Sequence, residues 1–301
     1  EALATTARKF GIGSSTGVDL SNDLRGKVLD REYKIARYKE LKAYYCRDAQ
    51  TNPDPYIRGI QRDNCADGDK WLPGDEVLQY IGQGETAVTP LQLAVAYTAL
   101  ANGGTIYAPR LAKAVVGAGQ KVLQRVNPKV RGRLGVDDAY LRYIRSALSD
   151  VTKTGTAQTA FRGFPFGQVE VAGKTGTAES GYEKRAHPRD PLVRKQDTSW
   201  FASFGGRPGQ PAKYVVLVMV EQAGQGGRVA APTVREIWEG MYGLGGRPAA
   251  LPHGETPTAL PRVLPDGSVA RPSVPPSTAP APAALGTSPA LDDARRRRAV
   301  W

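Results

Sequence analysis

Histidine and cysteine are scarce in this sequence, which has two of each among 301 residues. His187 and His253 lie far along the chain from both cysteines, so the spacing indicates no zinc site, and we expect no metal cofactor. No apolar run is long enough to cross a membrane, and the chain opens on Glu1 without a charged leader, which predicts neither an anchor nor a signal peptide within it. We expect the chain to be a piece of a longer protein.

The charge balance is basic, with a formal net charge of +12. Such a balance can indicate binding to nucleic acid or to an anionic surface. The residues from 247 onward hold seven Arg and four acidic residues, so they contribute +3 and the remainder of the chain +9. No recognition motif and no interleaving of aromatic and basic residues accompanies this charge. We therefore expect no nucleic-acid partner and interpret the charge as a solvated face beside an anionic surface.

Residues 89–102 are the clearest helix in the sequence. Thr89 is placed as the N-cap, Pro90 occupies the first helical position, and Gln92 completes a capping box. Apolar residues cover most of the circumference, and Gly103 follows as a left-handed cap. We expect this helix to pack in the core. Taken alone, however, the chain is expected to expose apolar surface around it.

The turn before that helix has a different composition. In Ile81-Gly82-Gln83-Gly84, two glycines flank one amide side chain and permit close approach of the backbone. This pattern predicts that Gln83 lines a binding site, although a tight turn alone explains it nearly as well. Two more helices are expected, over residues 138–151 and 231–242, and in the second Val234, Ile237, Trp238 and Met241 share one face.

An alternating strand runs directly into Lys174-Thr175-Gly176-Thr177. Val169 and Val171 point to one face and Glu170 to the other, which is the period of a half-buried strand. The small residues around Lys174 leave a strand edge against which the amide of a ligand can lie. Two further strands, at residues 199–204 and 213–220, predict an antiparallel meander.

Lys174-Thr175-Gly176 on such a strand resembles the third signature of the serine acyl-transfer enzymes that react with penicillin. Four further stretches, in the same order along the chain, resemble the transpeptidase domain of class B penicillin-binding proteins of the penicillin-binding protein 2 type. They are Trp71-Leu72-Pro73-Gly74-Asp75, Ile81-Gly82-Gln83-Gly84, Thr89-Pro90-Leu91-Gln92-Leu93-Ala94 and Ala101-Asn102-Gly103-Gly104. The resemblance covers residues 1–243.

The resemblance implies an α+β fold class, in which an antiparallel sheet is flanked by helices and joined to a mostly helical lobe, as in serine β-lactamases. The family sheet has about five strands, of which this chain would hold the last three, with the terminal helix and part of the lobe. It also implies site roles. Lys174 would supply positive charge, Thr175 and Thr177 would bind the carboxylate of the substrate, and the N–H group of Thr177 would complete an oxyanion hole.

Two parts of that active site are missing from the sequence. No serine has a lysine three residues later, and no Ser-x-Asn occurs. The nearest arrangement is Ser149 with Lys153 four residues on. The nucleophile and its lysine therefore lie outside this chain, and we expect the chain alone to be inactive.

The same tetrapeptide also occurs 21 positions earlier, as Lys153-Thr154-Gly155-Thr156. It follows a polar helix end, whereas Lys174 follows an alternating strand and precedes two more. Context therefore favours Lys174 as the site residue.

Cys46 and Cys65 enclose a polar segment that we expect to be a loop-rich insertion. Two interpretations stay open: a disulfide, or two free thiols in a reducing compartment. The extracytoplasmic location implied by the resemblance favours the disulfide, which would contribute about 3 kcal/mol for a loop of this size.

Three functions compete on this basis. The first is a peptidoglycan D,D-transpeptidase that cross-links stem peptides in cell-wall synthesis and is the target of β-lactam antibiotics. The second is a D,D-carboxypeptidase or β-lactamase of the same fold, and the third is a non-enzymatic binding or scaffold protein. We favour the first. It implies a location at the extracytoplasmic face of the bacterial cell membrane, with the anchor outside this chain, and glycosyltransferase, cell-shape or cell-division proteins as partners.

Residues 244–301 have a different composition, rich in Pro, Ala, Ser and Thr and ending in Arg295–Arg298. Such a segment buries too little apolar surface to offset the entropy of ordering it. We expect a disordered tail with a basic end.

Overall fold

The computed structural model describes residues 2–117, 121–183, 187, 190, 191, 193–246, 249 and 250. They fall into two compact units, one of which is the short segment Ala114–Gln124 with strands β2 (Ala114–Val116) and β3 (Val122–Arg125) at its ends. Within the described residues, every helix is too short or too polar to cross a bilayer.

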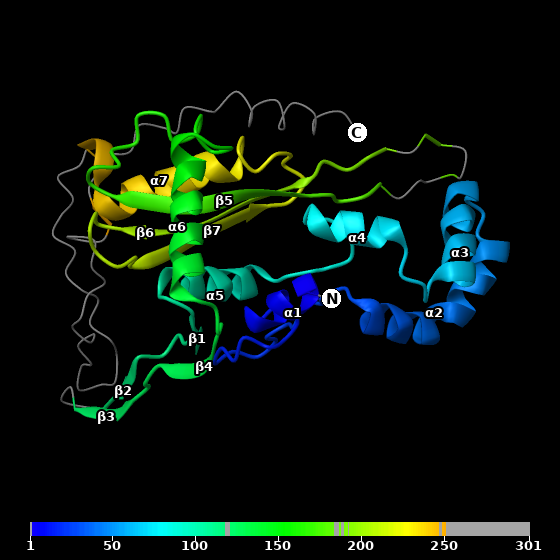
Figure 1. Ribbon diagram of the computed structural model, residues 1–301, viewed down its shortest axis with the longest axis horizontal. Coiled ribbons are helices and arrows are strands. Elements are labelled where there is room, and N and C mark those ends of the chain that lie inside the picture. Colours follow the sequence, from blue (N-terminus) through cyan, green and yellow to red (C-terminus); the bar gives the residue numbers. More distant parts are fainter. Residues whose placement is uncertain are drawn as a thin grey trace. The chain divides into compact units, whose positions relative to one another are not determined.

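The larger unit holds the remaining elements (Figure 1). Its helices are α1 (Ala2–Lys9), α2 (Arg31–Thr51), α3 (Pro55–Asp67), α4 (Pro73–Tyr80), α5 (Pro90–Ala101), α6 (Asp138–Lys153) and α7 (Ala230–Tyr242). Its strands are β1 (Thr105–Ala108), β4 (Lys129–Arg133), β5 (Glu170–Ala178), β6 (Thr198–Gly206) and β7 (Tyr214–Val220).

Strands β5, β6 and β7 form an antiparallel sheet in that order, which confirms the predicted meander. Lys174 of β5 lies opposite Ala202 of β6, and Ser203 of β6 lies opposite Val216 of β7. The order makes β5 an edge of this sheet. A second pair, β1 with β4, is antiparallel and has an irregular register between Ile106 and Tyr107.

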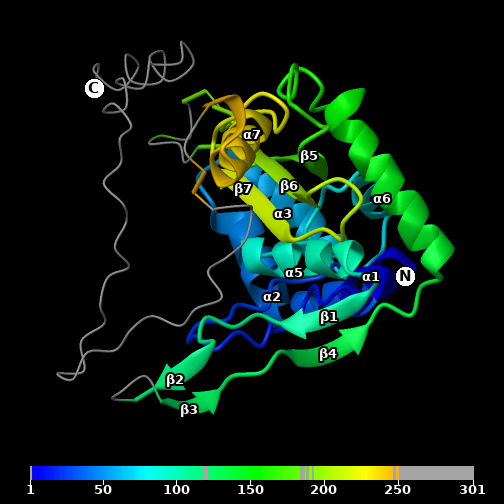
Figure 2. The same ribbon diagram turned by 90° about the vertical axis from the view of Figure 1, so that its left-hand side faces the viewer.

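Helices cover both faces of the sheet, and α6 lies beside β5 (Figure 2). On one face, α7 packs Val234 and Trp238 against Val171 and Phe201. On the other face, α5 packs with Ala172 and Phe204, together with residues of β1 and α6. The two clusters pack against β5 and β6 from both faces of the sheet and so support the strand that carries Lys174.

A buried hydrogen-bond chain joins α7 to the sheet. The indole N–H of Trp238 donates to Ser203 Oγ at 3.0 Å, and that hydroxyl donates to the carbonyl of Val216 at 2.9 Å. Val234 and Trp238 of the predicted apolar face are fully buried, whereas Ile237, at the margin of that face, is 38% exposed.

Helix α5 begins with the predicted capping box. The N–H of Gln92 donates to Thr89 Oγ1 at 3.1 Å, and the N–H of Thr89 donates to Gln92 Oε1 at 3.0 Å. The expected apolar exposure around this helix is wrong, because Phe204, Ile106 and Leu141 pack with its apolar residues. Exposed apolar side chains lie instead on and after α4, at Val77, Tyr80 and Ile81.

Cys46 and Cys65 are joined by a disulfide. The loop expected between them is wrong, since α2 and α3 occupy most of it. Asp54 caps α3 by accepting hydrogen bonds from the N–H groups of Tyr56 and Ile57, and Pro55 stands at the first helical position. Asn52-Pro53-Asp54-Pro55 is thus a helix start, which is a signal that the sequence contains.

The chain beyond α7 begins with a packed residue. Leu244 is 4% exposed and belongs to the cluster around Trp238, so the core extends past Gly243, where we placed the start of the tail. The rest of the predicted tail, from residue 251 onward, lies outside the described residues.

Candidate functional site

The two Lys-Thr-Gly-Thr copies lie in different structural settings. Lys153 is the last residue of α6, and the N–H groups of Thr154 and Gly155 both donate to the carbonyl of Asp150 as the helix ends. The second copy, residues 174–177, lies within β5. The flanking residues predicted this difference.

The backbone groups of alternate residues of β5 face away from β6. Thr152 Oγ1 donates to the carbonyl of Val171 at 2.9 Å, and Gln83 Nε2 donates to the carbonyl of Thr177 at 2.9 Å. In an antiparallel strand, the N–H and C=O of one residue point to the same side. The N–H of Thr177 therefore faces the free edge of β5.

The side chains of the tetrapeptide divide between the two faces of the strand. By alternation, Thr175 and Thr177 share one face and Lys174 lies on the other. Lys174 is exposed, and its Nζ donates to the carbonyl of Thr175 at 3.0 Å, so the ammonium group lies at the free edge. The structure thus brings the predicted site residues to one edge, from two faces.

Thr175 and Thr177 line a cavity of about 990 Å³ on the α7 side of β5. Thr175 Oγ1 lies 2.7 Å from Thr156 Oγ1, and the N–H of Gly226 donates to Thr177 Oγ1 at 3.3 Å. Hydroxyl groups, one guanidinium group and one carboxylate face this space. The residues that line it are Thr156, Thr159, Ala160, Thr175, Thr177, Asp197, Gln225, Gly227, Arg228 and Pro232.

Gln83 reaches β5 from the turn between α4 and α5. Gly82 and Gly84 have φ angles of +74° and +91°, which side-chain-bearing residues rarely adopt. The turn places the amide of Gln83 against the edge strand, 94 positions along the chain. The predicted binding-site glutamine thus contacts the predicted site strand directly.

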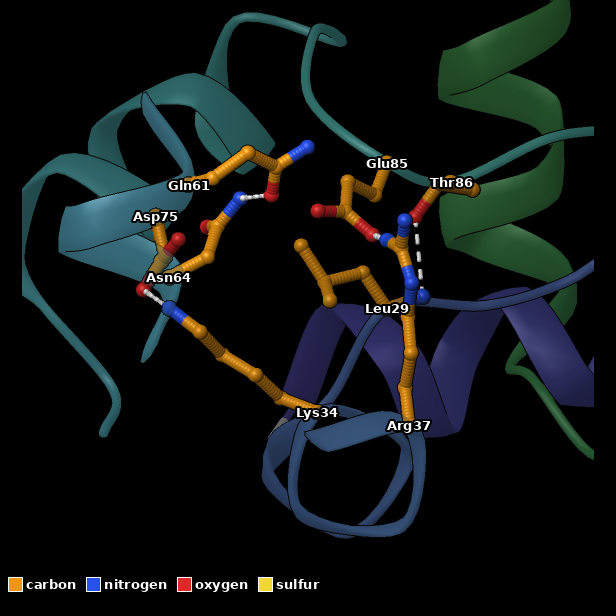
Figure 3. Close-up of polar contacts among 8 residues, drawn as sticks. All are labelled: Leu29, Lys34, Arg37, Gln61, Asn64, Asp75, Glu85 and Thr86. Atoms are coloured by element: carbon orange, nitrogen blue, oxygen red, sulfur yellow. Dashed lines mark hydrogen bonds and ion pairs between the residues drawn. The ribbon is translucent and has the colours of Figure 1, made fainter. Parts of the chain in front are cut away.

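Contacts from α2 and from Leu29, two residues before it, hold the segment around this turn (Figure 3). Arg37 forms an ion pair with Glu85, and Lys34 Nζ lies 2.5 Å from Asp75 Oδ2 at the start of α4. The N–H of Leu29 donates to Thr86 Oγ1 at 3.1 Å. These contacts fix both ends of the segment that presents Gln83.

Two contributors to the site were not predicted. Thr156 belongs to the copy at residues 153–156, whose flanking residues do not predict a site, and its proximity to Thr175 depends on the path of the chain between α6 and β5. Gly226 lies so close to β5 that a Cβ atom there would come within 2.4 Å of the carbonyl oxygens of Gly176 and Trp200. Its sequence signal is the glycine-rich run at residues 224–227.

This arrangement can bind an extended chain and an anion. The free edge of β5 offers backbone groups for pairing with a peptide, and threonine hydroxyls and Arg228 offer donors to a carboxylate. Lys174 adds positive charge at the same edge. A Ser-x-x-Lys pair is absent from the sequence.

Comparison with known proteins gives a consistent set of matches. Residues 1–239 match the family model described as the penicillin binding protein transpeptidase domain. Over 245 residues the chain is 27% identical to peptidoglycan D,D-transpeptidase MrdA of Haemophilus influenzae, and over 236 residues it is 29% identical to the protein of that name from Acinetobacter baumannii. These alignments cover 79% and 77% of this chain, and 32% and 30% of the relatives.

A solved structure shows the same fold. The chain from a study of a peptidoglycan synthase complex that coordinates polymerization and crosslinking superposes with a TM-score of 0.54 at 27% identity. The match covers 80% of this chain and 32% of that one. The present chain therefore spans about a third of the length of the proteins that it resembles.

Proposed function

Because the chain belongs to the penicillin-binding protein transpeptidase domain family, we propose that it supplies the Lys-Thr-Gly part of the active site of a peptidoglycan D,D-transpeptidase. The observation that carries this proposal is the position of residues 174–177. They lie on an edge strand with the backbone of Thr177 facing outward and two threonine hydroxyls in the cavity beside it.

The chemistry divides between this chain and the rest of the protein. A serine outside the chain attacks the carbonyl of a D-Ala-D-Ala bond, the peptide bond breaks, and the terminal D-Ala leaves as its amine. An amine of a neighbouring stem peptide then attacks the acyl-serine ester, which forms the cross-link and releases the serine hydroxyl. The N–H of Thr177 stabilises the oxyanion of each tetrahedral intermediate, which is worth about 3 kcal/mol for a well-placed donor. Thr175 and Thr177 hold the terminal carboxylate of the peptide, and Lys174 places a positive charge beside the reacting groups.

The substrate lies along β5 as an additional strand. A peptide in this position pairs with the outward-facing backbone groups of Gly173, Thr175 and Thr177. The side-chain amide of Gln83 already donates to the carbonyl of Thr177, so it limits how far the peptide extends past the end of the tetrapeptide. A β-lactam, which has an amide and a carboxylate in a similar spacing, is accommodated in the same way.

The setting of the complete protein follows from the same proposal. Peptidoglycan is assembled outside the cytoplasm, so the site faces the extracytoplasmic side of the cell membrane, and the Cys46–Cys65 disulfide is compatible with that compartment. A glycosyltransferase is proposed as a partner, because the similar solved structure concerns a complex of polymerization and crosslinking. Cell-shape or cell-division proteins are proposed on the resemblance alone.

Covalent labelling with a fluorescent penicillin tests this function. The full-length protein is expected to be labelled and the 301-residue chain to remain unlabelled, because the chain lacks the serine nucleophile. Labelling of the chain alone would reveal a nucleophile within it. If neither is labelled and both are folded by circular dichroism, the protein is a binding or scaffold protein and not a transpeptidase.

A further inference from the structure

The fourth residue of the first Lys-Thr-Gly-Thr copy touches the second residue of the other copy. Thr156 Oγ1 and Thr175 Oγ1 lie 2.7 Å apart, which is the distance of a good hydroxyl–hydroxyl hydrogen bond. The two residues are 19 positions apart and come from the turn after α6 and from β5. The copy with no strand before it thus contacts the candidate site through one side chain.

The backbone around Thr156 is held from two sides. The N–H of Gly155 donates to the carbonyl of Asp150 at 2.9 Å, and the N–H of Ala157 donates to the carbonyl of Val151 at 3.0 Å, which ties the turn to the end of α6. On its other side, Gly227 lies so close that a Cβ atom there would be 2.6 Å from the carbonyl oxygen of Thr156. The backbone of Thr156 is therefore fixed between the end of α6 and the loop at Gly227.

Each threonine hydroxyl has only one proton, and this limits which hydrogen bonds the Thr156–Thr175 pair can make. A threonine hydroxyl has one proton to donate and can accept hydrogen bonds at the same time. Thr177 Oγ1 accepts from the N–H of Gly226, a group that cannot itself accept, so the proton of Thr177 is left for another partner. The hydroxyl proton of Thr175 is likewise left for another partner only if Thr156 is the donor in the hydrogen bond between Thr156 and Thr175.

We propose that Thr156 is a positioning residue that donates its hydroxyl proton to Thr175 Oγ1 and so leaves the Thr175 proton for the carboxylate of a ligand. This inference rests on the proposed function for the identity of the ligand. Thr156 and the N–H of Gly226 then serve the same purpose, since each occupies the acceptor side of one threonine. Both hydroxyl protons of β5 are directed to an anion in the cavity.

Charges around the cavity agree with an anionic ligand. Arg228 lines it and supplies a positive charge, whereas the Asp197 carboxylate is paired with Arg194 at 3.2 Å. Hydrogen bonds in a chain polarise one another, so donation from Thr156 strengthens the bond from Thr175 to a carboxylate. The hydrogen bond from Thr175 to a carboxamide is strengthened less, because hydrogen bonds to charged acceptors are about twice as strong as those to neutral acceptors.

The test compares binding of acetyl-D-Ala-D-Ala and of its C-terminal carboxamide to this chain, followed by amide chemical shifts in NMR titrations. Wild type is expected to prefer the carboxylate. Thr156→Val is expected to lose about tenfold in affinity for the carboxylate with little change for the carboxamide, as for one hydrogen bond to a charged group. Thr156→Ser keeps the hydroxyl and is expected to retain the preference.

Thr154→Val is the matched control, because Thr154 lies in the same turn and its Oγ1 donates instead to the carbonyl of Asp150, at 3.3 Å. It is expected to bind both ligands as wild type does. The role of Thr156 would be overturned if Thr156→Val preferred the carboxylate over the carboxamide as strongly as wild type does. It would also be overturned if wild type showed no preference between the two ligands. Failure of the proposed function has a different signature, in which the carboxylate preference is present but penicillin does not label the full-length protein.

Discussion

The side-chain amide of Gln83 donates a hydrogen bond of 2.9 Å to the carbonyl of Thr177. This contact joins the turn before α5 to the edge strand at the residue whose N–H is proposed to stabilise the oxyanion. Both groups belong to Thr177, so a partner that fixes its carbonyl also restricts the direction of its N–H. Gln83 thus affects the site through the backbone of β5.

We expect Gln83→Ala to slow acylation of the full-length protein by penicillin about three- to tenfold, which corresponds to the net value of one hydrogen bond. Gln83→Glu is expected to be slower still, because a carboxylate cannot donate to the carbonyl and repels it. The second-order rate of labelling measures both effects. Gln79→Ala is the control, since Gln79 Nε2 on α4 donates to the carbonyl of Leu29 at 2.6 Å and does not touch β5. Equal rates for both alanine variants would contradict this role.

Gly226→Ala is expected to lower the free energy of unfolding by about 1–3 kcal/mol, because the added methyl group would lie 2.4 Å from the carbonyl oxygens of Gly176 and Trp200. Urea denaturation measures the change. Gly240→Ala in α7 is the control with the opposite sign. Apart from its chain neighbours and the nearby backbone of the helix, no heavy atom lies within 4 Å of a Cβ there, so the higher helix propensity of alanine is expected to add about 0.5–1 kcal/mol. A neutral Gly226→Ala would show that the loop at residues 224–227 is not packed against β5 as described.

Loss of the Cys46–Cys65 disulfide is expected to destabilise the α2–α3 pair by about 3 kcal/mol, because the bridge spans 19 positions. Hydrogen exchange on Cys46→Ala/Cys65→Ala is expected to show faster exchange in α2 and α3 and unchanged protection in β5 to β7. A reductant is expected to reproduce this pattern in wild type and to have no further effect on the double variant. Unchanged exchange in α2 and α3 would contradict the stabilising role of the bridge.

We expect the free energy of unfolding to depend on pH in the acidic range through Asp23. Its pKa is lowered from 3.8 to about 2, first by the hydroxyl of Ser15, whose Oγ donates at 2.6 Å, and also by the backbone groups of Thr16 and Gly17. Because the folded pKa lies below the unfolded one, the contribution is complete above about pH 4 and is lost as the pH falls through about 2. We expect the difference in unfolding free energy between wild type and Asp23→Asn to shrink over this range. A difference that stays constant from pH 5 to pH 2 would rule out this effect.

Local signals in the sequence were sufficient for much of the fold. The capping box of Thr89 and Gln92 and the alternation of Val169 and Val171 depend on near neighbours, and the helix and strand that they predicted are present. The meander followed from three strands in succession. The loop predicted at residues 46–65 was wrong because Asp54 and Pro55 form a helix start, which outweighs the polar composition of the segment.

The candidate site was less accessible to sequence reasoning. Lys174 could be separated from Lys153 by the strand before it, because strand context is local. The contacts of Thr156 with Thr175 and of Gln83 with Thr177 depend on how segments 19 and 94 positions apart meet in space. No pattern in one sequence specifies such a meeting, so these contacts required the structure.

The most direct test of the account is a comparison of Lys174→Ala with Lys153→Ala in the full-length protein. The rate of acylation by a fluorescent penicillin is the measurement, and circular dichroism checks that both variants are folded. Lys153, the last residue of α6, places its Nζ over the ring of Phe166, 5.7 Å from the ring centre, whereas Lys174 lies at the edge of β5. We expect Lys174→Ala to lose about 100-fold or more, as for a group that acts on the reacting atoms, and Lys153→Ala to match wild type. The reverse order, or equal losses, would contradict the assignment of residues 174–177 to the active site.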